Sequence, residues 1–304
     1  MKKAYIFSIL ILMAIVVSAQ QDPMYTQYWV NPQVLNPAQA GADGRTTLNA
    51  TARLQWINVK GAPRTYSVAL GGMVSNKVGL GLSYVHDQVG ISRTNSVNAD
   101  FAYHLNLTKR WKLITGLRVI GLINNVNFSE INTTVPGDPL FLENTTSGLK
   151  PNAGFGFLLT NNKFYLGYTE PRVVNYDFAS SKGVGNTRII SHRFMYAGYN
   201  FDISNDYKLR PSILTKQVEN APVQFDFNIV NEIRNRLLVG FSARTGEGVG
   251  IMVGFINYHK LDIYYCYDYP LTTISLLSKQ THQITLAYNL STRPQRINSP
   301  RYFN

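Results

Sequence analysis

The chain has 304 residues, with 29 Lys and Arg against 17 Asp and Glu, and a formal net charge of +12. Only 15% of its residues are charged and 12% are aromatic, a composition that excludes a disordered chain and a coiled coil. The single cysteine, Cys266, excludes an internal disulfide framework, and no Cys/His cluster offers a structural zinc site.

The first residues follow the pattern of a secretory signal peptide. Lys2 and Lys3 precede an apolar run over residues 4–17, and the small residues Ser18 and Ala19 are followed by Gln20. We therefore expect residues 1–19 to be cleaved and the rest of the chain to be exported. The alternative is a membrane anchor, which needs about 20 apolar residues, and this run is shorter.

Two segments without periodicity flank the remainder of the chain. Residues 20–44 are rich in Gln, Asn and Pro, and residues 291–304 carry three arginines and two prolines. We expect the first to lie at the periplasmic side as a cap or plug. We expect the second to be an extended or disordered periplasmic tail.

Between these segments the sequence alternates with a period of two. Along residues 48–56, for example, Leu48, Ala50 and Ala52 alternate with Asn49 and Thr51. Such alternation predicts strands with one apolar face and one polar or small face. We expect strands at 46–56, 64–73, 78–86, 93–105, 111–124, 151–160, 163–169, 192–201, 207–216, 222–230, 236–244, 248–256, 260–268 and 280–290.

This pattern favours an all-β transmembrane antiparallel barrel over residues 45–290, most simply of 14 strands. No stretch after residue 20 approaches the length of an apolar spanning helix. Fourteen is an even number, and the long connections 125–150, 170–191 and 269–279 all follow odd-numbered strands, as in outer-membrane barrels. The same parity predicts that both termini are periplasmic. The competing interpretation is a secreted β-sandwich, whose strands also alternate.

Signatures of catalysis are missing from the sequence. No H-E-x-x-H or G-x-S-x-G motif occurs, and His104 occupies a polar alternate position that predicts a lumen-facing side chain. The glycines around Gly79-Leu80-Gly81 lie inside an expected strand, where glycine marks close packing or curvature. We therefore assign no catalytic residue, no metal site and no cofactor.

The positive charge is scattered over turns and strand ends rather than concentrated in one patch. Nucleic-acid binding needs a concentrated basic patch interleaved with aromatic residues, so no nucleic-acid partner is expected. Basic residues at the rims of a barrel are instead suited to anionic outer-membrane lipid headgroups or lipopolysaccharide phosphates.

A family resemblance begins just after the predicted cleavage site. The run Gln21-Asp22-Pro23-Met24-Tyr25-Thr26-Gln27-Tyr28, then Asn31-Pro32 and Leu35-Asn36-Pro37-Ala38, closely resembles the start of the PorP/SprF family. The resemblance continues through Arg53-Leu54-Gln55-Trp56 and Gly61-Ala62-Pro63-Arg64-Thr65-Tyr66-Ser67, and more loosely over the rest of the chain. Members are outer-membrane proteins of the type IX secretion and gliding-motility machinery of Bacteroidetes.

The resemblance implies an outer-membrane barrel that is not an enzyme. It implies a component or cargo-specific partner of type IX secretion, helping to export or attach a large adhesin-like surface protein with a type B C-terminal sorting domain. Other secretion components are further implied partners. A general porin or transporter is the alternative function, and an outer-membrane enzyme with a Ser/His pair built across strands is a third.

The N-terminal motif supplies the candidate site residues. Each Asn before a proline is biased toward extended or turn conformations, and the aromatic side chains offer amphipathic area for packing. We expect these residues to plug the barrel or to bind a partner: Tyr25, Gln27, Tyr28, Trp29, Asn31, Pro32, Asn36 and Pro37.

Overall fold

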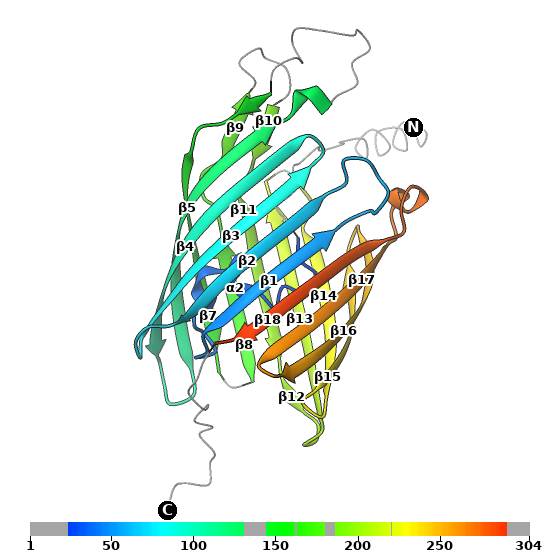
Figure 1. Ribbon diagram of the computed structural model, residues 1–304. Helices are drawn as coiled ribbons and strands as arrows, with labels where there is room; N and C mark the ends of the chain where they lie inside the picture. The colour runs from blue at the N-terminus through cyan, green and yellow to red at the C-terminus, as the bar shows by residue number, and fades with distance from the viewer. Residues whose placement is uncertain (1–23, 131–143, 162, 180–185, 220, 291–304) are drawn as a thin grey trace, which may run out of the picture.

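A computed structural model describes residues 24–130, 144–161, 163–179, 186–219 and 221–290. The predicted signal peptide and the tail after residue 290 lie outside these residues. The described chain forms one sheet that closes on itself (Figure 1). Closure is made by β1 and β18, whose antiparallel register runs from Thr47 opposite Asn289 to Leu54 opposite His282.

Fourteen strands of the described chain make the barrel wall, each hydrogen-bonded to the next. The predicted antiparallel barrel of 14 strands is confirmed, and a closed sheet excludes the sandwich. The strands are β1 (Thr47–Leu54), β2 (Arg64–Met73), β3 (Val78–Val89), β4 (Ser92–Asn106), β5 (Lys112–Val126), β7 (Lys150–Thr160), β8 (Phe164–Glu170), β11 (His192–Tyr199), β13 (Tyr207–Val218), β14 (Gln224–Ile233), β15 (Leu237–Arg244), β16 (Gly248–Tyr258), β17 (Leu261–Pro270) and β18 (Thr281–Asn289).

Several short elements are not among the fourteen wall strands, and the sequence patterns did not predict them as separate elements. A two-stranded sheet of β9 (Tyr176–Ala179) and β10 (Asn186–Ile189) stands above the barrel in Figure 1. The others are too short for a period to appear. They are α2 (Pro32–Leu35), the 3₁₀ turns η1 (Pro37–Gln39), η2 (Phe128–Glu130) and η3 (Thr273–Leu276), and the strand fragments β6 (Thr145–Thr146) and β12 (Phe201–Asp202), which pair with the wall strands β5 and β13.

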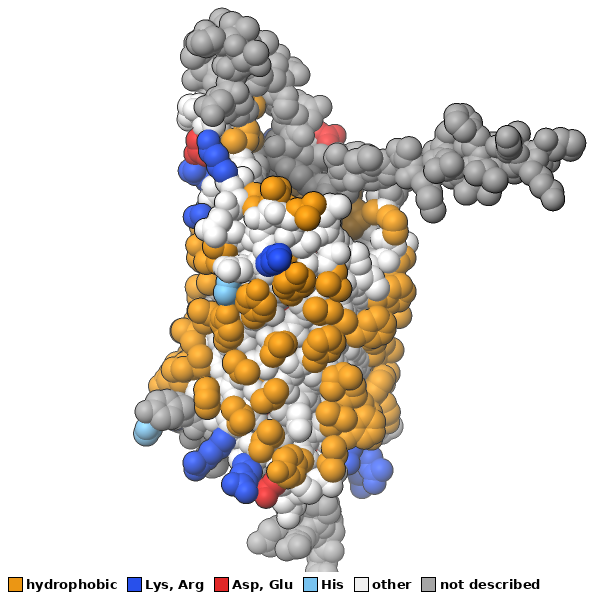
Figure 2. Space-filling model, turned by 90° about the vertical axis from the view of Figure 1, so that its right-hand side faces the viewer, with side chains coloured by type: hydrophobic (Ala, Val, Ile, Leu, Met, Phe, Trp, Pro, Cys, Tyr) orange, Lys and Arg blue, Asp and Glu red, His pale blue; other side chains and the backbone are white. Residues whose placement is uncertain are grey.

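The two faces of the wall differ in polarity, as the alternation predicts. On β5, Leu117 and Val119 are 62% and 69% exposed on the outside, whereas Arg118 between them is 3% exposed on the inside. Figure 2 shows hydrophobic side chains covering the outer face as a broad belt. An apolar exterior around a polar interior is the arrangement that a barrel in lipid requires, because its outward side chains face acyl chains rather than water.

The two ends of the barrel differ in their connections. We call one end the short-turn rim, whose described residues are 74–77, 107–111, 161, 163, 200–206, 234–236 and 259–260. The other is the long-loop rim, whose described residues are 55–63, 90–91, 127–130, 144–149, 171–179, 186–191, 219, 221–223, 245–247 and 271–280. β1 begins and β18 ends at the short-turn rim. Which rim faces the periplasm stays a prediction.

Among the described residues, no helix combines the length and the hydropathy that crossing a membrane demands.

Candidate functional site

The inside of the barrel is occupied by the chain's own N-terminal region. We call Met24–Gly44 the luminal segment. It lies within the ring of strands in Figure 1, where α2 is visible behind β1 and β2. Its contacts reach strands on all sides, from Gln33 bonded to Leu70 on β2 to Tyr28 bonded to Ser212 on β13. A segment touching opposite walls must fill the space between them.

The segment runs along the barrel axis from one rim toward the other. At its C-terminal end, the carbonyl oxygen of Ala40 lies 3.4 Å from Nε2 of His104, near the short-turn end of β4. At its other end, Thr26 bonds Asp268, near the long-loop end of β17. Met24 therefore lies toward the long-loop rim, opposite the start of β1. The prediction of two periplasmic termini places the start of the exported chain and the start of β1 at the same side of the membrane, and this direction was therefore not expected.

Asn36 anchors the middle of the segment. Its side chain is 0% exposed, and its Nδ2 donates to the carbonyl oxygens of Phe157 and Tyr168 and to Oη of Tyr196, at 3.1, 3.4 and 2.9 Å. Its Oδ1 accepts the amide of Ala38 at 2.8 Å, which caps η1. The extended backbone of Asn36 follows from the proline after it, which disfavours the helical region.

A buried ion pair on the wall holds the carbonyl groups of α2. Nε of Arg118 lies 2.6 Å from Oδ1 of Asp100, and the same guanidinium donates to the carbonyl oxygens of Gln33 and Val34 at 2.5 and 2.8 Å. Nε2 of Gln33 donates in turn to Asp100 at 3.2 Å. The planar guanidinium thus satisfies the carboxylate and two backbone acceptors at once, which a lysine could not do in one plane.

Glycines on the inner face of the wall leave room for the segment. A Cβ built at Gly116 would overlap the backbone of Ala38, and one at Gly79 would overlap the carbonyl oxygen of Ala40. Cβ atoms at Gly71, Gly81 and Gly156 would likewise meet the side chains of Gln33 or Asn36. For Gly79 and Gly81, interpreted from the sequence as marking close packing or curvature, close packing is confirmed, and the packing partner is the luminal segment.

A second charged cluster lies at the long-loop end of the segment. Nη1 of Arg53 lies 2.6 Å from Oδ2 of Asp268 and 2.8 Å from Oγ1 of Thr26. Beside it, Arg244 bonds Asp226 at 2.5 Å and Glu247 at 2.8 Å. Burial alone would raise the pKa of the Glu247 carboxyl, but the charge of Arg244 and hydrogen bonds from Arg244 and Gln224 outweigh it and lower this pKa to about 2.

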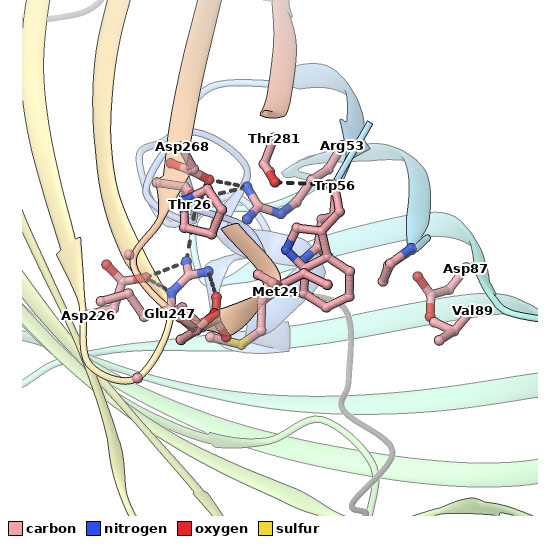
Figure 3. Close-up of a pocket in the computed structure, with 18 of the residues that line it drawn as sticks. Met24, Thr26, Arg53, Trp56, Asp87, Val89, Asp226, Glu247, Asp268 and Thr281 are labelled. Carbon is pink, nitrogen blue, oxygen red and sulfur yellow. Dashed lines mark hydrogen bonds and ion pairs between the residues drawn. The ribbon is translucent and has the colours of Figure 1, made fainter. Parts of the chain in front are cut away.

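Above this cluster the lumen opens into a cavity of about 1000 Å³. Figure 3 shows Met24 and Thr26 of the segment together with Arg53, Asp268, Asp226 and Glu247 around it. Toward the long-loop rim its lining is mixed: Asp87 and Arg172 contribute to it, and Leu276 and Leu277, at the end of η3, are 86% and 72% exposed. The barrel thus has a filled lower half and a vestibule at the long-loop rim, with a charged floor and two exposed leucines at its edge.

Residues 17–288 match the family described as type IX secretion system membrane protein PorP/SprF. The chain belongs to the PorP/SprF family. The match covers the luminal segment and nearly the whole wall, so the resemblance seen in the N-terminal motif extends along the barrel. No curated protein matches the chain.

Solved structures similar to this PorP/SprF barrel are bacterial outer-membrane proteins and channels. The toluene transporter TbuX of Ralstonia pickettii is 10% identical, with a TM-score of 0.50, and 84% of this chain and 92% of that one are covered. The Acinetobacter baumannii outer membrane protein Omp33 is 9% identical, with a TM-score of 0.48, covering 81% and 97%. At these identities the likeness shows the fold alone. Family and fold together identify an outer-membrane β-barrel of the type IX secretion system.

All eight candidate site residues of the PorP/SprF motif lie in the luminal segment. Oη of Tyr28 donates to Ser212 at 2.9 Å, and the ring of Trp29 meets that of Tyr264 edge-on at 5.5 Å. Oε1 of Gln27 accepts from Gln283. Pro32 and Pro37 begin α2 and η1, positions where the missing amide hydrogen costs nothing. The single ring nitrogen of Trp29 and the side-chain amide of Asn31 have no hydrogen-bond partner among the described protein atoms.

Sequence reasoning missed the wall residues that hold this motif. Arg53, Arg118 and Arg244 each stand at an inward position of an alternating strand, and that signal was present in the sequence. The sequence did not show which residues of the luminal segment and of the wall these three arginines would bind. The described residues hold no group of three His, Cys, Asp or Glu side chains arranged for a metal ion. His104 faces the lumen, as its place in the alternation predicts.

Proposed function

We propose that this barrel is a non-enzymatic, cargo-specific partner of type IX secretion rather than an open channel. The cargo would be a large adhesin-like surface protein with a type B C-terminal sorting domain, as in gliding motility. Family membership supports the secretion role. The main argument against a porin is the luminal segment. It crosses the lumen and makes hydrogen bonds to opposite walls.

The filled lumen argues against diffusion of solutes through the barrel. Fourteen strands would enclose an interior intermediate between small barrels filled by side chains and open porins. Here the buried Asn36 and the Arg118–Asp100 pair fix the segment to the wall, and the inner glycines let it lie directly against the strands. A solute would have to displace this segment, so the general porin or transporter remains the weaker candidate.

The orientation and the role of the motif belong to the same proposal. The short-turn rim would face the periplasm, because short periplasmic turns and long external loops are the usual asymmetry. The motif residues, Tyr25 to Pro37, would then act as a plug that shapes the floor of the vestibule. Cargo and other secretion components would contact the rims, where the exposed leucines beside η3 are one suitable surface.

The decisive experiment for the secretion role is purification of the tagged barrel from its native outer membrane. Mass spectrometry of what co-purifies should recover a protein with a sorting domain and secretion components. A matched tag on an unrelated outer-membrane barrel controls for background. Recovery of neither class would refute the proposal.

A second experiment separates the plug from the porin. Planar bilayers should show little conductance for the wild-type barrel and a large one after deletion of residues 21–44. High conductance of the wild type would favour the porin. If the deleted barrel still delivers cargo to the surface normally, the segment acts only as a plug and has no partner role.

A further inference from the structure

Two sequence runs outside the luminal segment meet beside the vestibule. Residues 53–56 end β1 and begin the connection after it, and residues 61–67 end that connection and begin β2. The amide of Gln55 donates to the carbonyl oxygen of Pro63 at 3.0 Å, which ties the two runs together. Trp56 is thereby held at the edge of the cavity, where it forms part of the lining.

Trp56 has a strained backbone that places its side chain in the vestibule. Its φ is 45°, in the left-handed region, where a bulky residue is a genuine outlier. Its amide donates to Oγ1 of Thr281 at 3.2 Å, which helps to hold this conformation. Figure 3 shows the indole in the middle of the lining residues, with the charged floor on one side and Asp87 on the other. Backbone strain in folded proteins clusters at ligand sites, so this residue points to a ligand in the cavity.

Asp87 presents a carboxylate to the vestibule without a cationic partner. It lies on β3 opposite Thr65, whose Oγ1 donates to its Oδ1 at 2.6 Å. In the part of the chain that the structure describes, no basic side chain forms an ion pair with it. A carboxylate has about four lone-pair sites, so one donor leaves most of its capacity open. This half-buried charge favours a cationic ligand, because an opposite charge offsets the loss of its hydration.

The charges on the floor of the vestibule are already paired and leave a negative balance. Arg53 bonds Asp268, and Arg244 bonds both Asp226 and Glu247. The described residues that line the whole cavity include four Asp and Glu against three Arg. An anion would have to compete with these carboxylates for the arginines, whereas a cation finds the carboxylate of Asp87 available.

We infer that the vestibule binds a ligand with an ammonium or guanidinium group, whose charge Asp87 neutralises and which packs against the indole of Trp56. The carboxylate supplies a charge-assisted hydrogen bond, and the indole supplies an aromatic face that attracts a cation. Thr94, opposite Asp87 on β4, lines the same wall and adds a hydroxyl group. The cationic group can belong to a free organic amine or to a lysine or arginine side chain. This inference does not depend on the secretion role.

The test is calorimetric titration of the purified barrel in neutral detergent. The probe is a short blocked peptide with one arginine, and the matched peptide carries citrulline, which has nearly the same shape without the charge. We expect the arginine peptide to bind at least about tenfold more tightly, because a hydrogen bond to a charged group is stronger than a neutral one. Its binding should weaken with added salt, which screens charges.

A third probe distinguishes the two sources of the cation. Agmatine carries the guanidinium group of arginine without a peptide backbone. If agmatine binds at least as tightly as the arginine peptide, the site takes free amines. If the peptide binds more tightly, the site takes a basic side chain of a polypeptide. Equal binding of the arginine and citrulline peptides would overturn the inference, and this comparison requires no variant of the barrel.

Variants of the barrel assign the binding to the two residues. Asp87→Asn keeps an acceptor for Thr65 but removes the charge, so it should weaken binding of the arginine peptide about tenfold. Trp56→Leu should weaken it about fivefold, and Trp56→Phe, which keeps an aromatic face, should restore most of that loss. Asp206→Asn, on the short-turn rim, is the matched control and should leave binding unchanged. Thermal unfolding of each variant checks that the barrel is intact, and unchanged binding in a folded Asp87→Asn barrel would also overturn the inference.

Discussion

Replacing Asn36 by alanine should release the luminal segment without opening the wall. The change removes three donated hydrogen bonds and leaves the buried amide of Ala38 without its acceptor. A buried group that loses its partner costs about 1–3 kcal/mol and each net hydrogen bond about 1 kcal/mol. The Asn36 amide has two hydrogens and so makes the equivalent of two full hydrogen bonds, worth about 2 kcal/mol, and the unpaired Ala38 amide adds at least about 1 kcal/mol. Tyr196 keeps its bond from Gln39 and adds no further loss, so we expect a total of about 3 kcal/mol.

The same chain offers a matched control at Asn31. Both residues are buried asparagines before a proline, but the amide of Asn31 bonds no described protein atom. Asn31→Ala should therefore change the stability of the docked segment little.

Hydrogen exchange followed by mass spectrometry in detergent measures this difference. A loss of about 3 kcal/mol corresponds to a rise of about 150-fold in the opening equilibrium. Amides of Met24–Gly44 should therefore exchange about that much faster in Asn36→Ala, while amides of β4 and β5 should not change. Equal exchange in the two variants, or no change in Asn36→Ala, would refute the reasoning that these hydrogen bonds hold the segment.

Three further predictions concern the wall, the vestibule and the direction of the segment. Gly116→Ala should displace Ala38 and raise bilayer conductance, because its new Cβ meets backbone, whereas Gly148→Ala, with open space around it, should not. The folded-state pKa of Glu247, about 2, lies below its ordinary value of 4.5, so its contribution to the free energy of unfolding is complete above pH 4.5 and lost toward pH 2. Unfolding midpoints measured across this range should show that loss, and Glu247→Gln should remove it. A cysteine replacing Met24 should react with an impermeant maleimide from the same side as one replacing Thr273 and from the side opposite one replacing Ser75; native Cys266, fully buried, should give no background. If the cysteine at position 24 reacted instead from the same side as the cysteine at position 75, the direction assigned to the segment would be wrong.

The strands could be predicted from sequence because lipid and water impose opposite demands on alternate residues. On β5, Leu117 and Val119 face outward while Arg118 and Ile120 face inward, and the period of two is visible without any tertiary knowledge. The turns were predictable for the same reason, since they interrupt that period. Strand number and antiparallel order then followed from counting.

The interior was less predictable because its contacts join residues far apart in the chain. Asn36 bonds residues more than 120 positions away, and Thr26 bonds Asp268 across 242 positions. A local pattern marked Asn36 as a turn residue but could not supply its partners. The short α2 and η1 turns were missed since four and three residues show no helical period.

The location of the luminal segment constrains how the barrel is assembled. The segment is continuous with β1, and the sheet closes where β1 meets β18, the last strand of the wall. Hairpins from β2 to β17 can pair in chain order, but the final seam joins residues more than 220 positions apart. The segment is therefore tethered directly beside that seam. If it already lies within the curving sheet when the seam forms, insertion into the membrane and occlusion of the pore are one event, and a newly made barrel never stands open between the two sides of the envelope.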